Sequence, residues 1–202
     1  MDDPTIPEEY KNKPLKWYKE EYLKLLAKKI AESERKRRNY IKKKEEERKA
    51  FICQKLESIF ATVFRQVSMN RFEERVHNRR REKGELKTEE ISEIWRQTQG
   101  EMFKDSVLLT DDYAIWWSYI PHFLHTPGYV YSYAFGELLV LALYALYRKE
   151  GASFVPKYLD LLTAGGSQTP YKLVEPFGVD LDDPRFWSDG FKIIDEMLGL
   201  VE

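Results

Sequence analysis

Apolar residues recur along most of this chain at intervals of three and four, which is the spacing of one face of an α-helix. The clearest stretch follows residue 50, and we expect it to continue through Phe72 and Val76 until Gly84 ends the helix. Its apolar positions are Ile52, Leu56, Ile59, Phe60, Val63, Phe64 and Val67. Thr88 is expected to cap the next helix. Because no strand-like alternation of apolar and polar residues occurs, the pattern predicts an all-α fold, a multi-helix bundle.

Proline marks two helix starts in the C-terminal half of the chain. Thr169-Pro170 and Asp183-Pro184 each pair a capping residue with a first helical residue. The last helix is predicted to carry one apolar face, formed by Trp187, Phe191, Ile194 and Leu198.

The most apolar segment is residues 129–147. Its uninterrupted apolar run, 138–147, is only ten residues long. A bilayer requires about 20 residues, and Glu137 would lie near the middle of the longer window. We therefore expect a buried helix of a soluble protein and no membrane association.

The first fifty residues differ from the rest in charge. They hold 16 Lys and Arg against 11 Asp and Glu, whereas residues 51–202 hold 17 against 23. Apolar positions from Leu15 to Ile30 have helical spacing, and residues 28–49 are almost wholly charged. The pattern predicts a charged helical extension over 1–49 and a second domain over 50–202. Because Glu45–Glu47 interrupt the positive field and Tyr40 is the only aromatic available for stacking, we do not expect nucleic-acid binding.

Overall composition narrows the class of protein. The chain has 202 residues, 43% hydrophobic and 33% charged, which is too apolar for a disordered chain and too charged for a membrane protein. Its single cysteine, Cys53, excludes an internal disulfide and fits a reducing compartment, so we expect a cytoplasmic protein. Cys53 adjoins an apolar stripe, and we expect it to be buried.

Candidate chemistry gathers in residues 118–137. This segment holds His122, His125, Tyr129, Tyr131 and Tyr133 around two prolines and a glycine. A tyrosine hydroxyl can donate to a developing oxyanion, and a neutral imidazole beside it can donate or accept. Three alternating tyrosines cannot share one helical face, so they either lie in a loop that enters a helix or divide between core and cleft. Packing residues with a solvated hydroxyl are the alternative interpretation.

The histidines do not form a recognisable metal site. His122 and His125 are three apart but lie between two prolines, and His77 belongs to a charged helix face that we expect to be exposed. The sequence contains no H-E-x-x-H motif and no cysteine pair. Because a catalytic zinc ion usually requires three protein ligands and a base, we expect this chain alone to bind no metal.

Three segments carry a more specific signal. They are SIFATVFRQVSMNRFEERVH (58–77), WWSYIPHFLHTPGYVYSYAFGELLVLALYALY (116–147), and FVPKYLDLLTAGGS with PFGVDLDDPRFW (154–187). Together they resemble the C-terminal part of oligoendopeptidase F, one of the thimet-oligopeptidase-like zinc peptidases. The resemblance covers roughly residues 50–202. It implies an almost entirely helical fold around a deep cleft, with zinc held by an H-E-x-x-H helix and a later glutamate.

The resemblance also implies roles for the candidate residues. Tyr133 and His122 match groups that contact the substrate carbonyl and stabilise the tetrahedral intermediate, while His125, Tyr129 and Tyr131 match substrate-binding positions. The zinc motif, the water-activating glutamate and the third zinc ligand have no counterpart in these 202 residues. The resemblance leads us to expect a bulky aromatic residue at the position of Gly128, and we expect the glycine to loosen the loop.

The leading hypothesis is therefore the C-terminal portion of a zinc-dependent oligoendopeptidase, which hydrolyses internal bonds of short peptides. Alone it is expected to be catalytically incomplete, and it would act on oligopeptides with a complementing chain that carries the zinc motif. One alternative is a non-catalytic helical interaction or peptide-binding protein derived from the same scaffold. Another is a decayed reading frame that folds poorly and exposes apolar surface.

Overall fold

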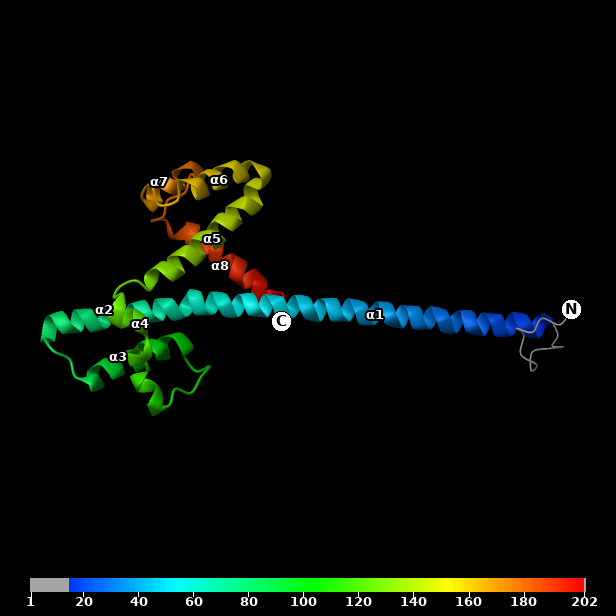
Figure 1. The fold of residues 1–202 in the computed structure, drawn as a ribbon, viewed down its shortest axis with the longest axis horizontal. Coiled ribbons are helices and arrows are strands. Elements are labelled where there is room, and N and C mark those ends of the chain that lie inside the picture. Colours follow the sequence, from blue (N-terminus) through cyan, green and yellow to red (C-terminus); the bar gives the residue numbers. More distant parts are fainter. Residues whose placement is uncertain (1–14, 202) are drawn as a thin grey trace. The chain divides into compact units, whose positions relative to one another are not determined.

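The computed structural model describes residues 15–201, which form helices and connecting turns without any strand (Figure 1). The predicted all-α fold is confirmed. In chain order the elements are α1 (Leu15–Thr62), α2 (Phe64–Lys83), α3 (Thr88–Phe103), η2 (Asp111–Tyr119), α4 (Pro121–His125), α5 (Tyr131–Glu150), η3 (Gly151–Ser153), α6 (Phe154–Ala164), α7 (Pro170–Val174), η4 (Glu175–Phe177) and α8 (Pro184–Gly199). Within residues 15–201, no helix combines the length and apolar character that crossing a membrane requires.

The chain divides into two compact units, Met1–Phe51 and Ile52–Glu202. In the first unit, α1 is a solvated helix with ion pairs one turn apart, such as Lys36 with Glu32 at 2.9 Å. The side chains of Leu15, Tyr18 and Tyr22, which the sequence placed on one face, lie outside the described residues. Because α1 runs without a break through residues 49 and 50, the boundary predicted there stays a prediction.

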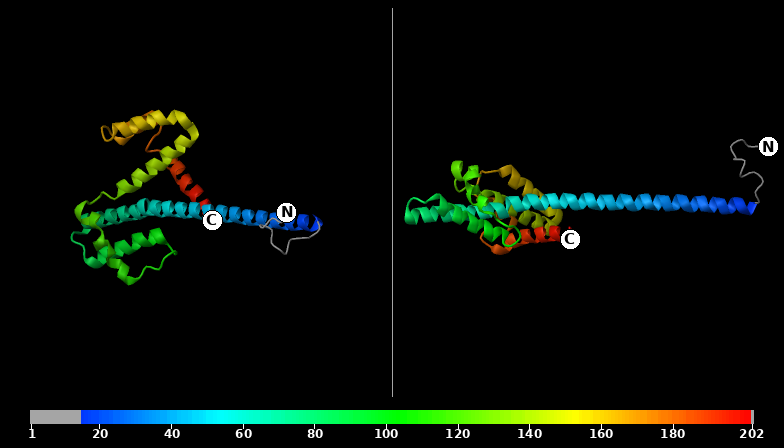
Figure 2. Two further views of the ribbon diagram at one scale, coloured as in Figure 1. Left: turned by 45° about the vertical axis from the view of Figure 1, so that its right-hand side comes forward. Right: turned by 90° about the horizontal axis from the view of Figure 1, so that it is seen from below.

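In the second unit, α5 and α8 pack against each other and cross at an angle (Figures 1 and 2). Small residues let the two helices approach closely. A Cβ atom added at Gly190 would lie 3.1 Å from the backbone nitrogen of Ala142 and 3.3 Å from the carbonyl oxygen of Leu138. The last turns of α1 complete this first core cluster, whose buried members are Ile52, Leu56, Ile59, Val63, Ala134, Leu141, Ala145, Ile193 and Ile194.

Two further clusters pack against other parts of α5. The far side of its C-terminal half meets α6, α7, η4 and α8 around Ala142, Leu143, Phe154, Val174, Phe177, Leu181 and Phe186. Just before its first turn, Val130 is fully buried in a third cluster with Met69, Phe72 and Trp95. The start of α5 is thus held by α2 and α3, whereas its remaining turns are held by α8 and α6.

A buried polar network joins α2 to α3. Gln99 donates from its side-chain amide to the Ser68 hydroxyl at 2.9 Å, and Ser68 donates to the carbonyl oxygen of Thr98 at 3.0 Å. The Tyr113 hydroxyl of η2 donates to Gln99 at 3.4 Å. Burial raises the pKa of Tyr113, which keeps its phenol protonated as this donor.

Several sequence-based expectations are corrected by the structure. Cys53 is exposed, because it lies on the solvent side of α1 and one helical step of about 100° separates it from buried Ile52. Phe191 is also exposed, since the core face of α8 runs through Phe186, Gly190 and Ile194.

The N-cap of α3 and the burial of α5 also differ from the predictions. Helix α3 starts at Thr88, and its N-cap is Lys87, one residue before the predicted cap Thr88. The Lys87 backbone N–H donates to the Glu90 carboxylate. The tyrosine-rich helix is confirmed as α5, but one side of it is not buried, because Val140 and Tyr144 remain half-exposed. The expected exposure of His77 is confirmed.

Replacement of Gly190 tests the close approach of α5 and α8. Gly190→Ala is expected to lower the free energy of unfolding, because overpacking costs about 1–3 kcal/mol and the helix propensity of alanine returns only about 1 kcal/mol. The matched control is Gly136→Ala within α5, where an added Cβ meets no atom within 4 Å. It should be neutral or slightly stabilising in urea titrations followed by circular dichroism. Equal stability of the two variants would contradict the close approach.

Acid titration tests the ion pairs across the same helix pair. Asp189 on α8 accepts from Lys149 of α5 at 2.6 Å and from Lys192 at 2.7 Å, and these two hydrogen bonds lower its pKa to about 2. A carboxylate with a depressed pKa in the folded state stabilises the protein above its unfolded pKa, so this contribution should disappear as the pH falls from about 4 to about 2. In Asp189→Asn, the urea midpoint should therefore change less over that range than in the unmodified chain. An identical change in both proteins would show that the pairs contribute nothing.

Candidate functional site

Three of the five candidate side chains meet at the start of α5. The His122 Nε2 atom and the Tyr133 hydroxyl share a hydrogen bond of 3.0 Å, whose direction depends on the imidazole tautomer. The Tyr129 ring is parallel to the His122 ring, with centroids 6.3 Å apart, and meets the Tyr133 ring edge-on at 5.5 Å. We call these residues, His122, Tyr129 and Tyr133, the His/Tyr cluster.

The His/Tyr cluster is open to solvent. Tyr129 keeps 50% and Tyr133 keeps 37% of its surface exposed, and His122 is half-buried. The rings of Tyr129 and Tyr133 are thus restrained by neighbouring rings, while both side chains stay partly accessible to solvent. Such an arrangement is suited to binding a polar group that arrives from outside the chain.

The other two candidates are separate from this cluster. Tyr131 is the first residue of α5 and His125 the last residue of α4, and both are exposed. Among residues 15–201, no hydrogen bond or ring contact joins either of them to the His/Tyr cluster. Their substrate-binding roles stay predictions. Of the three alternating tyrosines, Tyr129 lies in the turn before α5, whereas Tyr131 and Tyr133 lie in the first turn of that helix.

Local backbone geometry explains how residues eleven apart come together. Pro121 occupies the first turn of α4, where its missing N–H costs no hydrogen bond. The chain then turns through hydrogen bonds from Thr126 N–H to the His122 carbonyl and from Tyr129 N–H to the Thr126 carbonyl. Gly128 sits within this turn at φ +77°, a conformation that side chains with a Cβ rarely adopt. Glycine therefore permits this turn.

Helix α2 supports this turn from beneath. The Glu73 carboxylate accepts the Gly128 backbone N–H at 2.8 Å, and Phe72 packs on Phe123 with ring centroids 5.0 Å apart. Since Phe123 follows His122 and Gly128 precedes Tyr129, α2 contacts the chain next to both rings. We expect these contacts to limit the loosening that Gly128 alone would cause.

Glu73 was missed by sequence reasoning, which assigned its segment to a charged helix face. A signal was present, however. Met69, Phe72 and Val76 define the buried face of α2, and Glu73 lies four residues after Met69 on that same face. An acidic residue at a core position of an amphipathic helix rarely occurs without a partner, so its position could have indicated a buried hydrogen bond.

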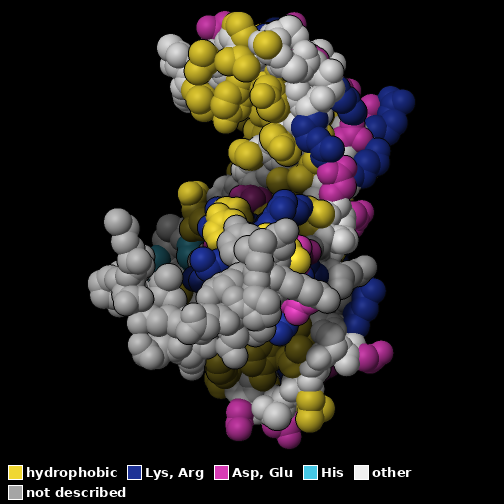
Figure 3. Space-filling view, turned by 90° about the vertical axis from the view of Figure 1, so that its right-hand side faces the viewer, with side chains coloured by type: hydrophobic (Ala, Val, Ile, Leu, Met, Phe, Trp, Pro, Cys, Tyr) yellow, Lys and Arg dark blue, Asp and Glu magenta, His cyan; other side chains and the backbone are white. Residues whose placement is uncertain are grey.

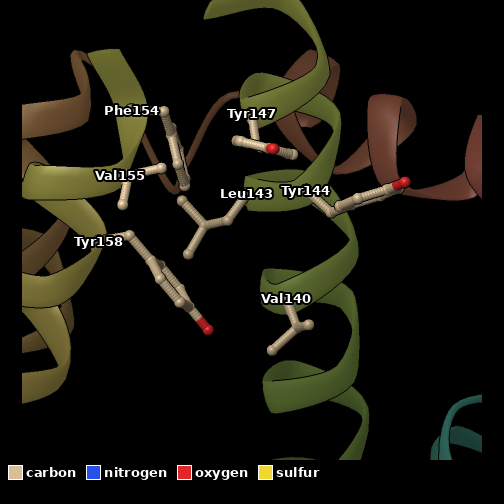
Figure 4. Close-up of a pocket in the computed structure, with 7 residues that line it drawn as sticks. All are labelled: Val140, Leu143, Tyr144, Tyr147, Phe154, Val155 and Tyr158. Carbon is tan, nitrogen blue, oxygen red and sulfur yellow. The ribbon is translucent and has the colours of Figure 1, made fainter. Parts of the chain in front are cut away.

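A second feature of α5 lies further along the helix. Between α5 and α6 is an apolar groove of about 310 Å³, lined by Val140, Leu143, Tyr144, Tyr147, Phe154, Val155 and Tyr158. Figure 4 shows Leu143 directed toward Phe154 and Tyr158, while Tyr144 points away from α6. The hydrophobic side chains at the top of Figure 3 gather over this part of α5 and α6. We call this surface the α5–α6 groove.

The α5–α6 groove continues a stripe that begins at the His/Tyr cluster. Tyr133, Val140, Tyr144 and Tyr147 are separated by seven, four and three residues, which keeps them on one side of a helix. All four are between 37% and 54% exposed, whereas the opposite side of α5 is buried against α8. This side of α5 therefore has the pattern of a helix surface that packs against another helix or polypeptide.

The residues of this chain do not fit a zinc site. Within residues 15–201 there is no group of three or more His, Cys, Asp or Glu side chains arranged to hold a metal ion. The sequence also lacks the H-E-x-x-H pattern that would supply two ligands and a base.

Comparison with known proteins places the chain in a family. The model of peptidase family M3 matches residues 30–193, so the match begins inside the 1–49 extension. The oligopeptidase PepF of Bacillus subtilis (strain 168) is 32% identical over 158 residues, and the plasmid-encoded oligoendopeptidase F of Lactococcus lactis subsp. cremoris is 26% identical over 160 residues. These matches cover 78% and 79% of this chain but 23% and 26% of the relatives.

A solved structure has the same fold. The crystal structure of oligoendopeptidase-F from Enterococcus faecium superposes with a TM-score of 0.67 at 24% identity, covering 78% of this chain and 31% of that one. The chain thus spans about a quarter of the length of the curated relatives that it matches. Since the family model matches most of its residues, this chain belongs to peptidase family M3.

Proposed function

We propose that this chain supplies the substrate-binding and oxyanion-stabilising side of a zinc-dependent oligoendopeptidase, which hydrolyses internal bonds of short peptides. Family M3 consists of zinc metallopeptidases, which supports the reaction class. The observation that carries the proposal is the exposed hydrogen bond between Tyr133 and His122, with Tyr129 stacked beside it.

In this proposal Tyr133 donates its hydroxyl proton in a hydrogen bond to the carbonyl oxygen of the scissile peptide bond. That oxygen gains negative charge in the tetrahedral intermediate, so the hydrogen bond strengthens as the reaction proceeds. His122 fixes the Tyr133 hydroxyl through the 3.0 Å contact and offers its own polar edge to the substrate backbone. Tyr129 limits the rotation of both rings. His125 and Tyr131 are proposed to contact the peptide further from the reacting bond.

We further propose that the chain needs a zinc-bearing polypeptide of the same family to act. Nothing in its sequence has the pattern that would activate water, and relatives are about four times longer than the matched segment. The α5–α6 groove supports this proposal, because its apolar stripe leads directly away from the His/Tyr cluster. A helix of the zinc-bearing polypeptide is the occupant we propose for that groove.

The chain alone is expected to leave a fluorescence-quenched oligopeptide uncut in the presence of zinc. Addition of the Bacillus subtilis relative without the segment matched by this chain should restore cleavage. The control is each polypeptide assayed separately. Turnover by this chain alone, with contaminating peptidases excluded, would contradict its proposed incompleteness, and failure of a stable mixed complex to cleave would contradict the proposed activity.

Tyr133→Phe tests the proposed oxyanion contact in the complemented enzyme. Loss of one oxyanion donor typically lowers kcat by about 100- to 1000-fold, and KM should change much less because the contact strengthens in the transition state. Tyr171→Phe is the matched control, since its hydroxyl donates to Asp182 outside the cluster. A Tyr133→Phe variant with unchanged kcat would remove the basis of the proposed role.

Tyr144→Glu tests the proposed occupant of the α5–α6 groove. Tyr144 is 48% exposed, so the substitution should leave the free energy of unfolding nearly unchanged while it places a charge against an apolar partner. We expect Kd for the zinc-bearing polypeptide to rise by about tenfold or more, as for loss of an interface anchor. Thr163→Glu, at an exposed position of α6 that does not line the groove, is the control. Equal binding by both variants would exclude this surface.

A further inference from the structure

We propose that Glu73 is a positioning residue for the His/Tyr cluster, an inference that rests on the function proposed above. Glu73 does not contact His122, Tyr129 or Tyr133 through any hydrogen bond found among residues 15–201. It acts on them through the backbone, by holding the Gly128 N–H at the turn from which Tyr129 and Tyr133 follow.

The environment of Glu73 argues against a role in stability alone. Its side chain is only 4% exposed, and its Oε2 atom is buried without a hydrogen-bond partner among the described residues. Burying a carboxylate with one oxygen unpaired destabilises a fold, and an apolar side chain of similar volume would avoid that cost. The carboxylate at this position is therefore explained better by its hydrogen bond to the Gly128 N–H than by a contribution to stability.

Two contacts from consecutive residues of α2 set the spacing of the cluster. Phe72 packs against Phe123, the residue after His122, and Glu73 binds Gly128, the residue before Tyr129. Both ends of the turn are thus held by the same helix, α2. The 3.0 Å bond between His122 and Tyr133 and the stacking of Tyr129 on His122 both join residues on opposite sides of this turn, so we expect them to depend on the position of Gly128.

Gly128 cannot hold this turn by itself. It has φ +77° and no side chain, and a Cβ atom added there would meet no atom within 4 Å, so its backbone is restrained by hydrogen bonding and not by side-chain packing. The Glu73 carboxylate adds a restraint from α2 to the local hydrogen bond that the Tyr129 N–H donates to the Thr126 carbonyl.

Nuclear magnetic resonance on the full chain tests the inference directly. The sequence holds only three histidines, His77, His122 and His125, so the imidazole signals can be assigned individually. Overhauser contacts between the His122 ring and the rings of Tyr129 and Tyr133 report the geometry of the cluster. Glu73→Leu removes the acceptor at similar volume, Glu73→Gln retains an acceptor oxygen at the same reach, and Glu74→Leu alters the exposed neighbour on α2.

We expect Glu73→Leu to lose these contacts while its free energy of unfolding is equal to or higher than that of the unmodified chain. Glu73→Gln and Glu74→Leu should retain them. Retention of the contacts in Glu73→Leu, or their loss in Glu73→Gln, would overturn the proposal. Should Glu73→Leu not fold, Glu73→Asp decides, because its carboxylate is one methylene too short to reach Gly128 and must lose the contacts.

These spectra need neither metal nor substrate, so their outcome is independent of peptidase activity. Loss of the ring contacts in Glu73→Leu together with unchanged kcat for Tyr133→Phe would leave Glu73 as a positioning residue and refute the proposed function. Retention of the ring contacts in Glu73→Leu together with a lowered kcat for Tyr133→Phe would refute the role of Glu73 and leave the proposed function intact.

Discussion

The close approach of α5 and α8 is the contact on which the second unit depends. At Gly190 the backbones are near enough that a single added carbon would meet main-chain atoms of α5. Apolar side chains around this point form the first core cluster, and α6 and α7 pack on the other side of the same helix. Because α5 begins directly after the turn that bears Tyr129, the direction in which α8 holds α5 also determines where Tyr133 lies.

Helical periodicity predicted the longer helices of the second unit, because α2, α3, α5 and α8 each have a buried face. Glycine or proline marks several helix ends, such as Gly84 after α2, Gly151 after α5 and Pro184 at the start of α8. Asp183 caps α8 through the Arg185 backbone N–H as the sequence indicated. The prediction failed where the buried stripe was narrower than the apolar one. Cys53 lies next to buried Ile52 in the sequence but on the exposed side of α1. On α8, Gly190 and not Phe191 faces α5, because a residue without a side chain allows the close approach of the two helices.

The candidate site could be predicted in composition but not in geometry. Residue types alone indicated that His122 and the tyrosines form one group, yet only the fold separates Tyr131 and His125 from it. That separation depends on the turn at Gly128 and on its support by Glu73, contacts between residues 55 positions apart. A pattern of short intervals cannot encode such a contact. The charge of Glu73 also made its segment look like a solvated surface, although one of its faces is buried.

The polar network between α2 and α3 has a consequence for how this part of the chain folds. Ser68, Thr98 and Gln99 are each at most 4% exposed, and their hydrogen bonds are satisfied only in the observed alignment. If α3 slipped by one turn along α2, the Gln99 amide would be buried against apolar side chains with nothing to bind. The buried hydrogen bonds therefore favour a single register of α3 on α2, and a chain that pairs these helices out of register loses them.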